Sequence, residues 1–182
     1  AKVGGWEYDV LNDELRWTQV TYDIHELSGD FVPTPGQGIS FYKEGESREK
    51  ISRVFTAAVQ EGKPFDEELI ILTTTGKEKW VRAIAEPVLD NGKCIKVTGV
   101  FQDIDDQKKA REALKTSEQT LKTYIDASPL GIFVADLKGQ YLDANKAGEI
   151  LTGYSCHDLL SLTIADVFDQ KHVEKGLSIV QS

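Results

Sequence analysis

The residue types that most often carry catalysis or bind metals are few and scattered in this sequence. The histidines are His25, His157 and His172, and the cysteines are Cys94 and Cys156. Neither His25 nor His157 has a partner ligand three or four residues further on, as a metal site on a helix would need. No Ser/His/Asp or Cys/His arrangement has a catalytic spacing, and no glycine-rich phosphate loop is present. The sequence therefore predicts a protein region without catalytic residues or a metal site.

Composition and charge narrow the class of protein. The chain has 182 residues, 40% of them hydrophobic, and a formal net charge of −9. The hydrophobic fraction is enough for a packed core. The negative net charge argues against nucleic acids and anionic membranes as partners, because both attract basic surfaces. Apolar runs such as Leu69–Leu72 are far too short to cross a membrane, and the cysteines suggest no disulfide framework. We expect a cytoplasmic fragment of a longer protein, with no nucleic-acid partner and no direct membrane contact.

Turn signals and apolar periodicity divide residues 1–104 into short elements. Asn91 and Gly92 form the strongest hairpin signal in the chain. A helical apolar stripe begins at Ile51, and Gly62 and Pro64 end it. The expected elements are strands over 5–10, 14–17, 65–73, 78–89 and 93–103, helices over 18–27 and 47–62, and a loop over 28–38. Two strands, a helical middle and three antiparallel strands predict one α+β domain.

Residues 105–127 are predicted to form a charged helix that follows the last strand without a loop. Its apolar residues include Leu114 and Leu121, which are seven residues apart, and Ile125, four residues further on. This spacing is typical of a coiled-coil contact, but two heptads suit a one-sided surface helix equally well.

A motif from the start of the chain returns after this helix. WEYDVLNDELRW (6–17) and FVADLKGQYLDAN (133–145) share an aromatic residue, an aspartate three positions later, a polar turn and a second short strand. The aligned aspartates, Asp9 and Asp136, lie 127 residues apart (136 − 9). The repeat predicts a second, incomplete copy of the domain over residues 128–182. Because such a copy lacks three strands, we expect Gly131–Ser182 to be loosely ordered unless another segment completes it.

Three stretches together resemble tandem PAS domains, the first with its PAC segment. They are GGWEYDVLNDELRWT, EGKPFDEELIILTTTGKEKWVRAIAEPVLDNGKCIKVTGVFQDIDDQKKAREAL and SPLGIFVADLKGQYLDANKAGEILTGYS. The resemblance implies a five-stranded antiparallel sheet with helices packed on one face, which form a pocket. Residues 103–105 resemble the segment at which the family's last strand passes into a helix. The resemblance implies that changes at the pocket reach a signalling helix through this segment.

The signal-relay candidates are accordingly Asp103, Ile104 and Asp105. Asp103 and Ile104 match the family's usual Asp-Ile-Thr exit, but Asp105 stands where threonine is usual. We therefore expect Asp105 to cap the helix through its carboxylate.

Pocket candidates follow from the sheet face that the resemblance places under the helices. They are Trp6, Tyr8, Trp17, Leu69, Ile71, Trp80, Arg82 and Val97. Trp80, Arg82 and Ile84 share one face of their strand and Val81, Ala83 and Ala85 the other, and periodicity leaves open which is inward. For any single candidate, a role in filling the core is the favoured alternative. An inward Arg82 would favour an anionic ligand, whereas an outward Arg82 would pair with Glu86 or Glu68.

The resemblance names no cofactor for this chain. Haem-binding PAS domains usually supply a histidine from the long helix, and residues 47–62 contain none. A light-sensing relative would need its cysteine in a longer motif, and neither Cys94 nor Cys156 lies in one.

The function that the resemblance implies is sensing. We expect a non-enzymatic module that binds a small ligand or partner and relays the change to the output domain of a sensor histidine kinase. The alternatives are the sensor region of a diguanylate cyclase and a ligand-free scaffold for dimerisation. A homodimer would use the PAS flanks and the connector helix, with Leu114, Leu121 and Ile125 at the contact.

Overall fold

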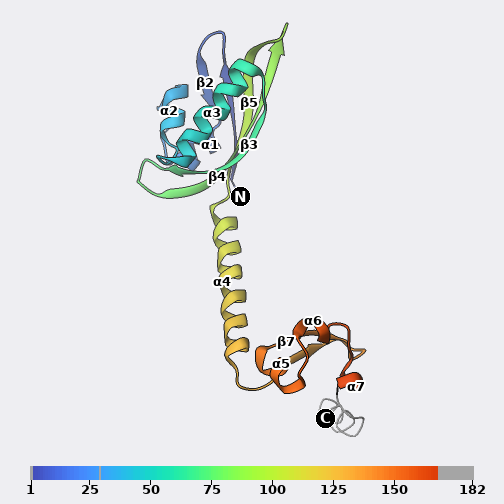
Figure 1. Cartoon of the computed structure of the whole chain (residues 1–182). Coiled ribbons are helices and arrows are strands. Elements are labelled where there is room, and N and C mark those ends of the chain that lie inside the picture. The colour runs from blue at the N-terminus through green and yellow to red at the C-terminus, as the bar shows by residue number, and fades with distance from the viewer. Residues whose placement is uncertain (1, 29, 168–182) are drawn as a thin grey trace. The chain divides into compact units, whose positions relative to one another are not determined.

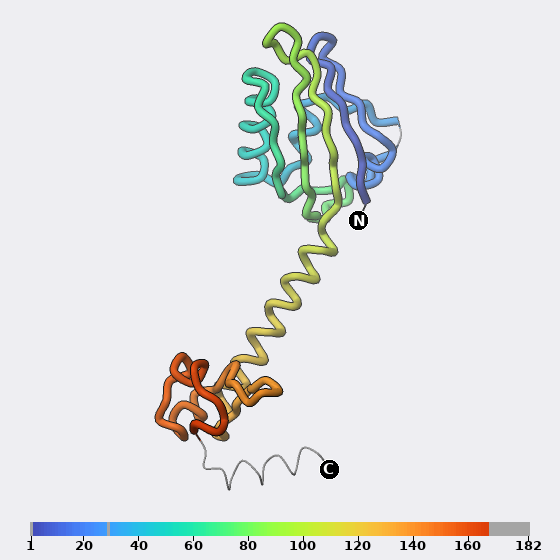
Figure 2. Tube along the Cα trace, turned by 90° about the vertical axis from the view of Figure 1, so that its right-hand side faces the viewer, coloured from blue at the N-terminus to red at the C-terminus, as the bar shows by residue number. Residues whose placement is uncertain are grey.

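The computed structural model describes residues 2–28 and 30–167, and the chain divides into two compact units, Ala1–Glu112 and Ala113–Ser182. The first unit is an antiparallel sheet of five strands with helices against one face (Figure 1). Its elements are β1 (Val3–Asp9), β2 (Glu14–Trp17), α1 (Gln19–His25), α2 (Pro35–Ser40), α3 (Glu46–Glu61), β3 (Phe65–Leu72), β4 (Glu78–Asp90) and β5 (Lys93–Asp103), and α4 (Asp105–Ala127) follows. The strands lie side by side in the order β2-β1-β5-β4-β3 (Figure 2). The predicted α+β class and the five-stranded sheet are confirmed.

Local conformation explains where these elements end. Asn91 and Gly92 both have positive φ values, 47° and 79°, which suit the two-residue turn that joins β4 to β5. Gly62 caps α3 in the left-handed region, at φ 64°, and its N–H donates to the Ala57 carbonyl. A residue with a Cβ would be strained at Gly62, because left-handed backbone suits glycine best.

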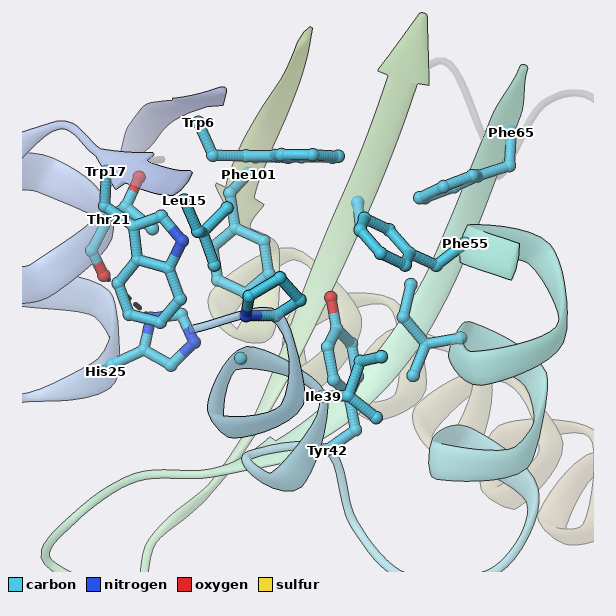
Figure 3. A pocket seen from close by; sticks show the side chains of 14 residues that line it. Trp6, Leu15, Trp17, Thr21, His25, Ile39, Tyr42, Phe55, Phe65 and Phe101 are labelled. Atoms are coloured by element: carbon cyan, nitrogen blue, oxygen red, sulfur yellow. Dashed lines mark hydrogen bonds between the residues drawn. The ribbon is translucent and has the colours of Figure 1, made fainter. Parts of the chain in front are cut away.

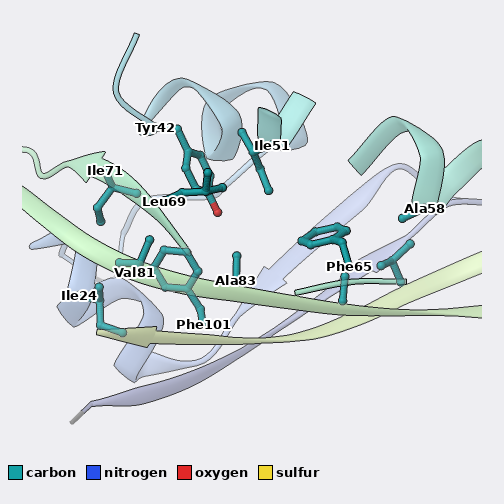
Figure 4. Close-up of a cluster of buried hydrophobic side chains, with 12 residues drawn as sticks. Ile24, Tyr42, Ile51, Ala58, Phe65, Leu69, Ile71, Val81, Ala83 and Phe101 are labelled. Carbon is teal, nitrogen blue, oxygen red and sulfur yellow. The ribbon is translucent and has the colours of Figure 1, made fainter. Parts of the chain in front are cut away.

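The core lies between the sheet and the helices (Figure 4). Along β4, Val81, Ala83 and Ala85 are fully buried, so this face points inward and the face of Trp80 and Arg82 points away. The buried cluster also takes side chains from the helices and the other strands: Ile24, Tyr42, Ile51, Ala58, Phe65, Leu69, Ile71, Val97 and Phe101. Packing therefore settles the choice of face that periodicity left open.

The expected loop over residues 28–38 is wrong at its end, because α2 begins at Pro35. Thr34 forms a capping box with Gln37, in which the Gln37 N–H donates to the threonine hydroxyl and the Gln37 side chain accepts from the Thr34 N–H. Proline at the first helical position is favourable, since its missing N–H would have no partner there. Proline and glycine thus mark the start of a helix here and not a continuous loop.

Over residues 128–167, the second unit contains a shorter strand pair and three short helices. Its elements after α4 are β6 (Phe133–Ala135), β7 (Tyr141–Ala144), α5 (Lys146–Thr152), α6 (Cys156–Leu159) and α7 (Ile164–Val167), and β6 pairs with β7 in an antiparallel sheet. The strand, turn, strand and helix of the predicted repeat occur in this order. The looseness expected for Gly131–Ser182 stays a prediction, and residues 168–182 lie outside the described part of the chain.

Candidate ligand cavity and signalling junction

A cavity of about 60 Å³ lies in the first unit, between the inward face of the sheet and the helices (Figure 3). Its wall is mainly aromatic and aliphatic. The aromatic side chains come from four strands, from α3 and from the segment between α2 and α3: Trp6, Trp17, Tyr42, Phe55, Phe65 and Phe101. None of the residues that line it is Asp, Glu, Lys or Arg. The cavity thus offers shape and aromatic contact but no formal charge.

His25, at the end of α1, forms part of this wall. Its ring stacks between Trp17 and Phe101, with ring centroids 4.5 and 4.8 Å away and planes within 18° and 16° of parallel. The His25 Nδ1 atom lies 2.8 Å from the Thr21 carbonyl oxygen, and a carbonyl only accepts, so Nδ1 carries the proton. Burial lowers the pKa of His25 to about 4, so the ring is neutral near pH 7.

Tyr42 enters the cavity from the segment between α2 and α3. Its side chain is 6% exposed, and its hydroxyl points into the space near Phe55 and Phe101 (Figure 3). Burial raises the pKa of Tyr42 well above its ordinary value of 10, so the hydroxyl keeps its proton. The backbone of Tyr42 is anchored by a bridge to Ile71 of β3.

The structure separates the sequence-predicted pocket residues into three groups. Trp6 and Trp17 line the cavity. Leu69, Ile71 and Val97 are buried in the surrounding core without lining it.

The third group, Tyr8, Trp80 and Arg82, does not line the cavity, although the Tyr8 ring packs against Phe55 of its wall, with ring centroids 5.5 Å apart. The Tyr8 hydroxyl donates to Asp13 at 2.8 Å; burial and this carboxylate raise the pKa of Tyr8 to about 12. Trp80 and Arg82 are on the outward face of β4. Arg82 forms a forked ion pair with Asp66, which raises the arginine's pKa, so the partner is neither Glu68 nor Glu86.

Sequence reasoning missed most of the wall, including His25, Tyr42 and Phe101. Phe101 had a signal, since it lies two pairs of residues beyond Val97 and so on the same strand face. His25 lies four residues after buried Thr21, on the same side of α1. Tyr42 had no such signal, because it belongs to no periodic segment.

The junction between β5 and α4 consists of one residue, Ile104, which is 4% exposed. Its N–H donates to the Trp80 carbonyl at 2.9 Å, and the N–H of Asp105 donates to the Asp103 carboxylate at 3.0 Å. The capping expectation is therefore corrected: Asp103 satisfies the first N–H of the helix. The Asp105 carboxylate instead accepts from the Trp80 N–H of β4 at 3.4 Å.

The first turn of α4 is also tied to the outward face of the sheet. Lys108 pairs with Glu68 of β3, and its ammonium lies 4.6 Å from the centroid of the Trp80 ring. Asp105 pairs with Lys109 at 2.7 Å and so raises the pKa of that lysine. A displacement of β4 or β5 would therefore reach the start of α4 through direct contacts.

The remaining described residues that the sequence analysis considered as candidates lie outside the cavity wall and the junction. Leu114, Leu121 and Ile125 are exposed on α4, with exposed fractions of 61%, 58% and 41%. Cys94 donates to the Lys96 carbonyl, Cys156 contacts Asp143, and His172 lies outside the described residues. Over residues 2–28 and 30–167, no cluster of three His, Cys, Asp or Glu side chains could hold a metal ion, and no helix is long and apolar enough to cross a membrane.

Comparison with known proteins agrees with this architecture. Residues 14–101 match a family model described as the PAS fold, and residues 119–181 match one described as a PAS domain. The sensor protein FixL of Bradyrhizobium diazoefficiens is 27% identical over 84% of this chain and 30% of its own length. The probable diguanylate cyclase DgcE of Escherichia coli is 21% identical over 91% of this chain and 15% of its own length.

A solved structure shows the same fold. A sensory box histidine kinase/response regulator from Burkholderia thailandensis superimposes with a TM-score of 0.54 and 17% identity, over 68% of this chain and 92% of that one. The chain spans less than a third of the length of either curated relative. With two PAS models matching successive segments and a PAS-fold sheet in the first of them, the chain belongs to the PAS family of sensory domains.

Proposed function

We propose that the first PAS domain senses a small ligand in its aromatic cavity and passes the change through residues 103–105 into α4. One observation carries the proposal. β5 supplies Phe101 to the cavity wall, and two residues later the Asp103 carboxylate accepts from the first N–H of α4; the carbonyl of the next residue, Ile104, accepts from the Lys108 N–H. A shift of Phe101 is thus coupled to the helix over a short, hydrogen-bonded path.

The output domain lies in the parent protein. FixL and the Burkholderia protein are a sensor and a histidine kinase by name, and DgcE is a probable diguanylate cyclase by name. We place the module in the cytoplasm, in a two-component sensor histidine kinase, with a diguanylate cyclase as the alternative parent. The fragment itself then has no enzymatic activity, and its contribution is to bias the equilibrium of the output domain.

A double-mutant cycle in the full-length parent tests the relay without knowledge of the ligand. Ala83→Val adds volume to the cavity wall and serves as the input, and autophosphorylation is the output. We expect Ala83→Val to change autophosphorylation at least about fivefold, a coupling typical of allosteric sites, and the change to vanish when Asp103→Ala is added. For the alternative parent, synthesis of a cyclic dinucleotide replaces autophosphorylation as the readout.

Asp106→Ala is the matched control, because it removes a nearby aspartate from the first turn of α4 and keeps the hydrogen bond from the Asp105 N–H to the Asp103 carboxylate. It should leave the response to Ala83→Val in place. An unchanged response in the Asp103→Ala background would remove Asp103 from the relay.

Homodimerisation through α4 is a second candidate, favoured by its exposed apolar side chains. Leu114 and Leu121 are both more than half exposed and one heptad apart. We expect light scattering to show a dimer that Leu121→Glu converts to a monomer and Lys122→Glu does not. A wild-type protein that is monomeric at every concentration would exclude the dimer and the scaffold function that depends on it.

A further inference from the structure

Two polar atoms in the cavity wall lack a hydrogen-bond partner. Within the described part of the chain, no group accepts from or donates to the Tyr42 hydroxyl, and burial alone accounts for its raised pKa. His25 uses Nδ1 for the Thr21 carbonyl, and its other ring nitrogen, Nε2, has no protein partner in the same part. Both side chains are more than nine-tenths buried. Both residues line the cavity, so a ligand there could form the hydrogen bonds that these two atoms do not make within the protein.

The Tyr42 hydroxyl and His25 Nε2 require opposite hydrogen-bonding groups on a ligand. The Tyr42 hydroxyl is protonated and free to donate, so it calls for an acceptor on the ligand. Because Nδ1 of the neutral His25 ring carries the proton, Nε2 presents a lone pair and calls for a donor. Thr21 does not compete, since its hydroxyl already donates to the Gly5 carbonyl at 2.9 Å.

The rest of the wall limits charge and size. A charged ligand would be desolvated there without a counter-charge, because no Asp, Glu, Lys or Arg lines the cavity. A cavity of about 60 Å³ is smaller than the roughly 150 Å³ that accommodates benzene in an engineered protein core. A single ring therefore fits only if the wall yields. Pro35, Gly38 and Ile39 are the part of the wall that we expect to move, because they belong to α2, a helix of six residues none of which is fully buried.

We propose that the cavity selects a small, neutral molecule of one ring or less that carries a hydroxyl group, of the alcohol or phenol class. A hydroxyl is the smallest group that can accept from Tyr42 or donate to His25, and the aromatic wall suits a flat apolar body. This inference rests on the proposed sensing function and specifies its ligand.

Phenol and benzene are matched probes for this inference, since they differ only in the hydroxyl. The three tryptophans supply the readout in a ¹H–¹⁵N spectrum of the whole chain. The indole N–H signals of Trp6 and Trp17 report on the cavity, whereas Trp80, on the opposite face of the sheet, is an internal control. We expect phenol to shift the first two signals and to bind about threefold to tenfold more tightly than benzene.

Tyr42→Phe removes the hydroxyl and keeps the ring. The variant should lose the preference for phenol while its urea midpoint stays equal to that of wild type or rises, because the deleted hydroxyl had no partner. A lowered midpoint would show that the hydroxyl is already bonded in the free protein and would overturn the inference.

The remaining outcomes separate this inference from the sensing function. Equal binding of phenol and benzene, in wild type and variant alike, would overturn selection by hydroxyl and leave an apolar ligand cavity. Failure of both probes to shift Trp6 and Trp17 would overturn the ligand class, and the Asp103 double-mutant cycle would still decide the relay. Shifts at Trp80 of the same size would show non-specific binding and count against the inference.

Discussion

Mild acid should destabilise the first PAS domain through a single buried side chain, His25. Its ring is 2% exposed between Trp17 and Phe101, and burial, aided by the positive charge of Lys79, lowers its pKa from 6.5 to about 4. The unfolded chain therefore takes up the proton at a higher pH than the folded domain does. The contribution of the neutral His25 ring to the free energy of unfolding is fully present above about pH 6.5 and is lost as the pH falls toward 4.

The size of the effect follows from proton linkage. At 1.36 kcal/mol per pKa unit, the free energy of unfolding falls by about 1.4 kcal/mol at pH 5.5 and by about 2.5 kcal/mol at pH 4.5. Carboxylates with lowered pKa act in a lower window. Glu26, bound by Thr75 and Lys79, has its pKa lowered from 4.5 to about 2, and its contribution is lost only within that range. The interval from about pH 6.5 to about pH 4.5 thus isolates the histidine.

Urea unfolding followed by tryptophan fluorescence measures this effect, since Trp6, Trp17 and Trp80 all belong to the first unit. The control is His25→Phe, which keeps a stacked ring but cannot titrate. We expect the wild-type midpoint to fall across the interval and the variant's midpoint to stay nearly flat. A flat wild-type profile, or the same slope in His25→Phe, would refute the assignment.

Two further predictions concern packing. Gly99→Ala should destabilise the first unit by about 2–3 kcal/mol in the same urea assay, because an added Cβ would lie 2.2 Å from the Ile84 carbonyl oxygen and 2.3 Å from the Trp6 ring. The control is Gly36→Ala, which has open space around it and should be neutral or slightly stabilising. Equal effects of the two substitutions would contradict the argument. Asn145→Ala should destabilise the second unit by about 2–4 kcal/mol, because this buried side chain accepts from two backbone N–H groups and donates to two carbonyls. Backbone hydrogen exchange should become faster in residues 113–167 and not in the first unit. Unchanged exchange in the variant would refute the prediction.

The pairing of Arg82 shows where sequence reasoning ended. The sequence suggested an outward arginine paired with Glu68 or Glu86, and the structure has it outward but paired with Asp66. In the β3–β4 register Glu68 is directly opposite Arg82, and Asp66 is the diagonal neighbour. Glu68 instead pairs with Lys108 of α4. Only the packing of the helix start against the sheet distributes the two carboxylates in this way.

The cavity shows the same limit. Trp6 and Trp17 could be named from the sequence because they lie in strands with clear turn signals. Tyr42 could not, because its position depends on a bridge to Ile71 and on no periodic pattern. The stack of His25 between Trp17 and Phe101 joins segments from opposite ends of the domain, and no local rule predicts such a contact.

The sequence alone predicted the order of the strands and of every helix in the first unit except α2, together with the bounds of β2, β5 and α4 and the direct passage from strand to helix. These depend on short-range causes: turn residues with positive φ, alternation of side chains, and charge at a helix start. Tertiary contacts settle which face of β4 is inward, which aspartate caps α4, and which polar atoms in the cavity have no protein partner. Those outcomes depend on contacts between distant segments, where burial and competition for partners set the energy and periodicity carries no information.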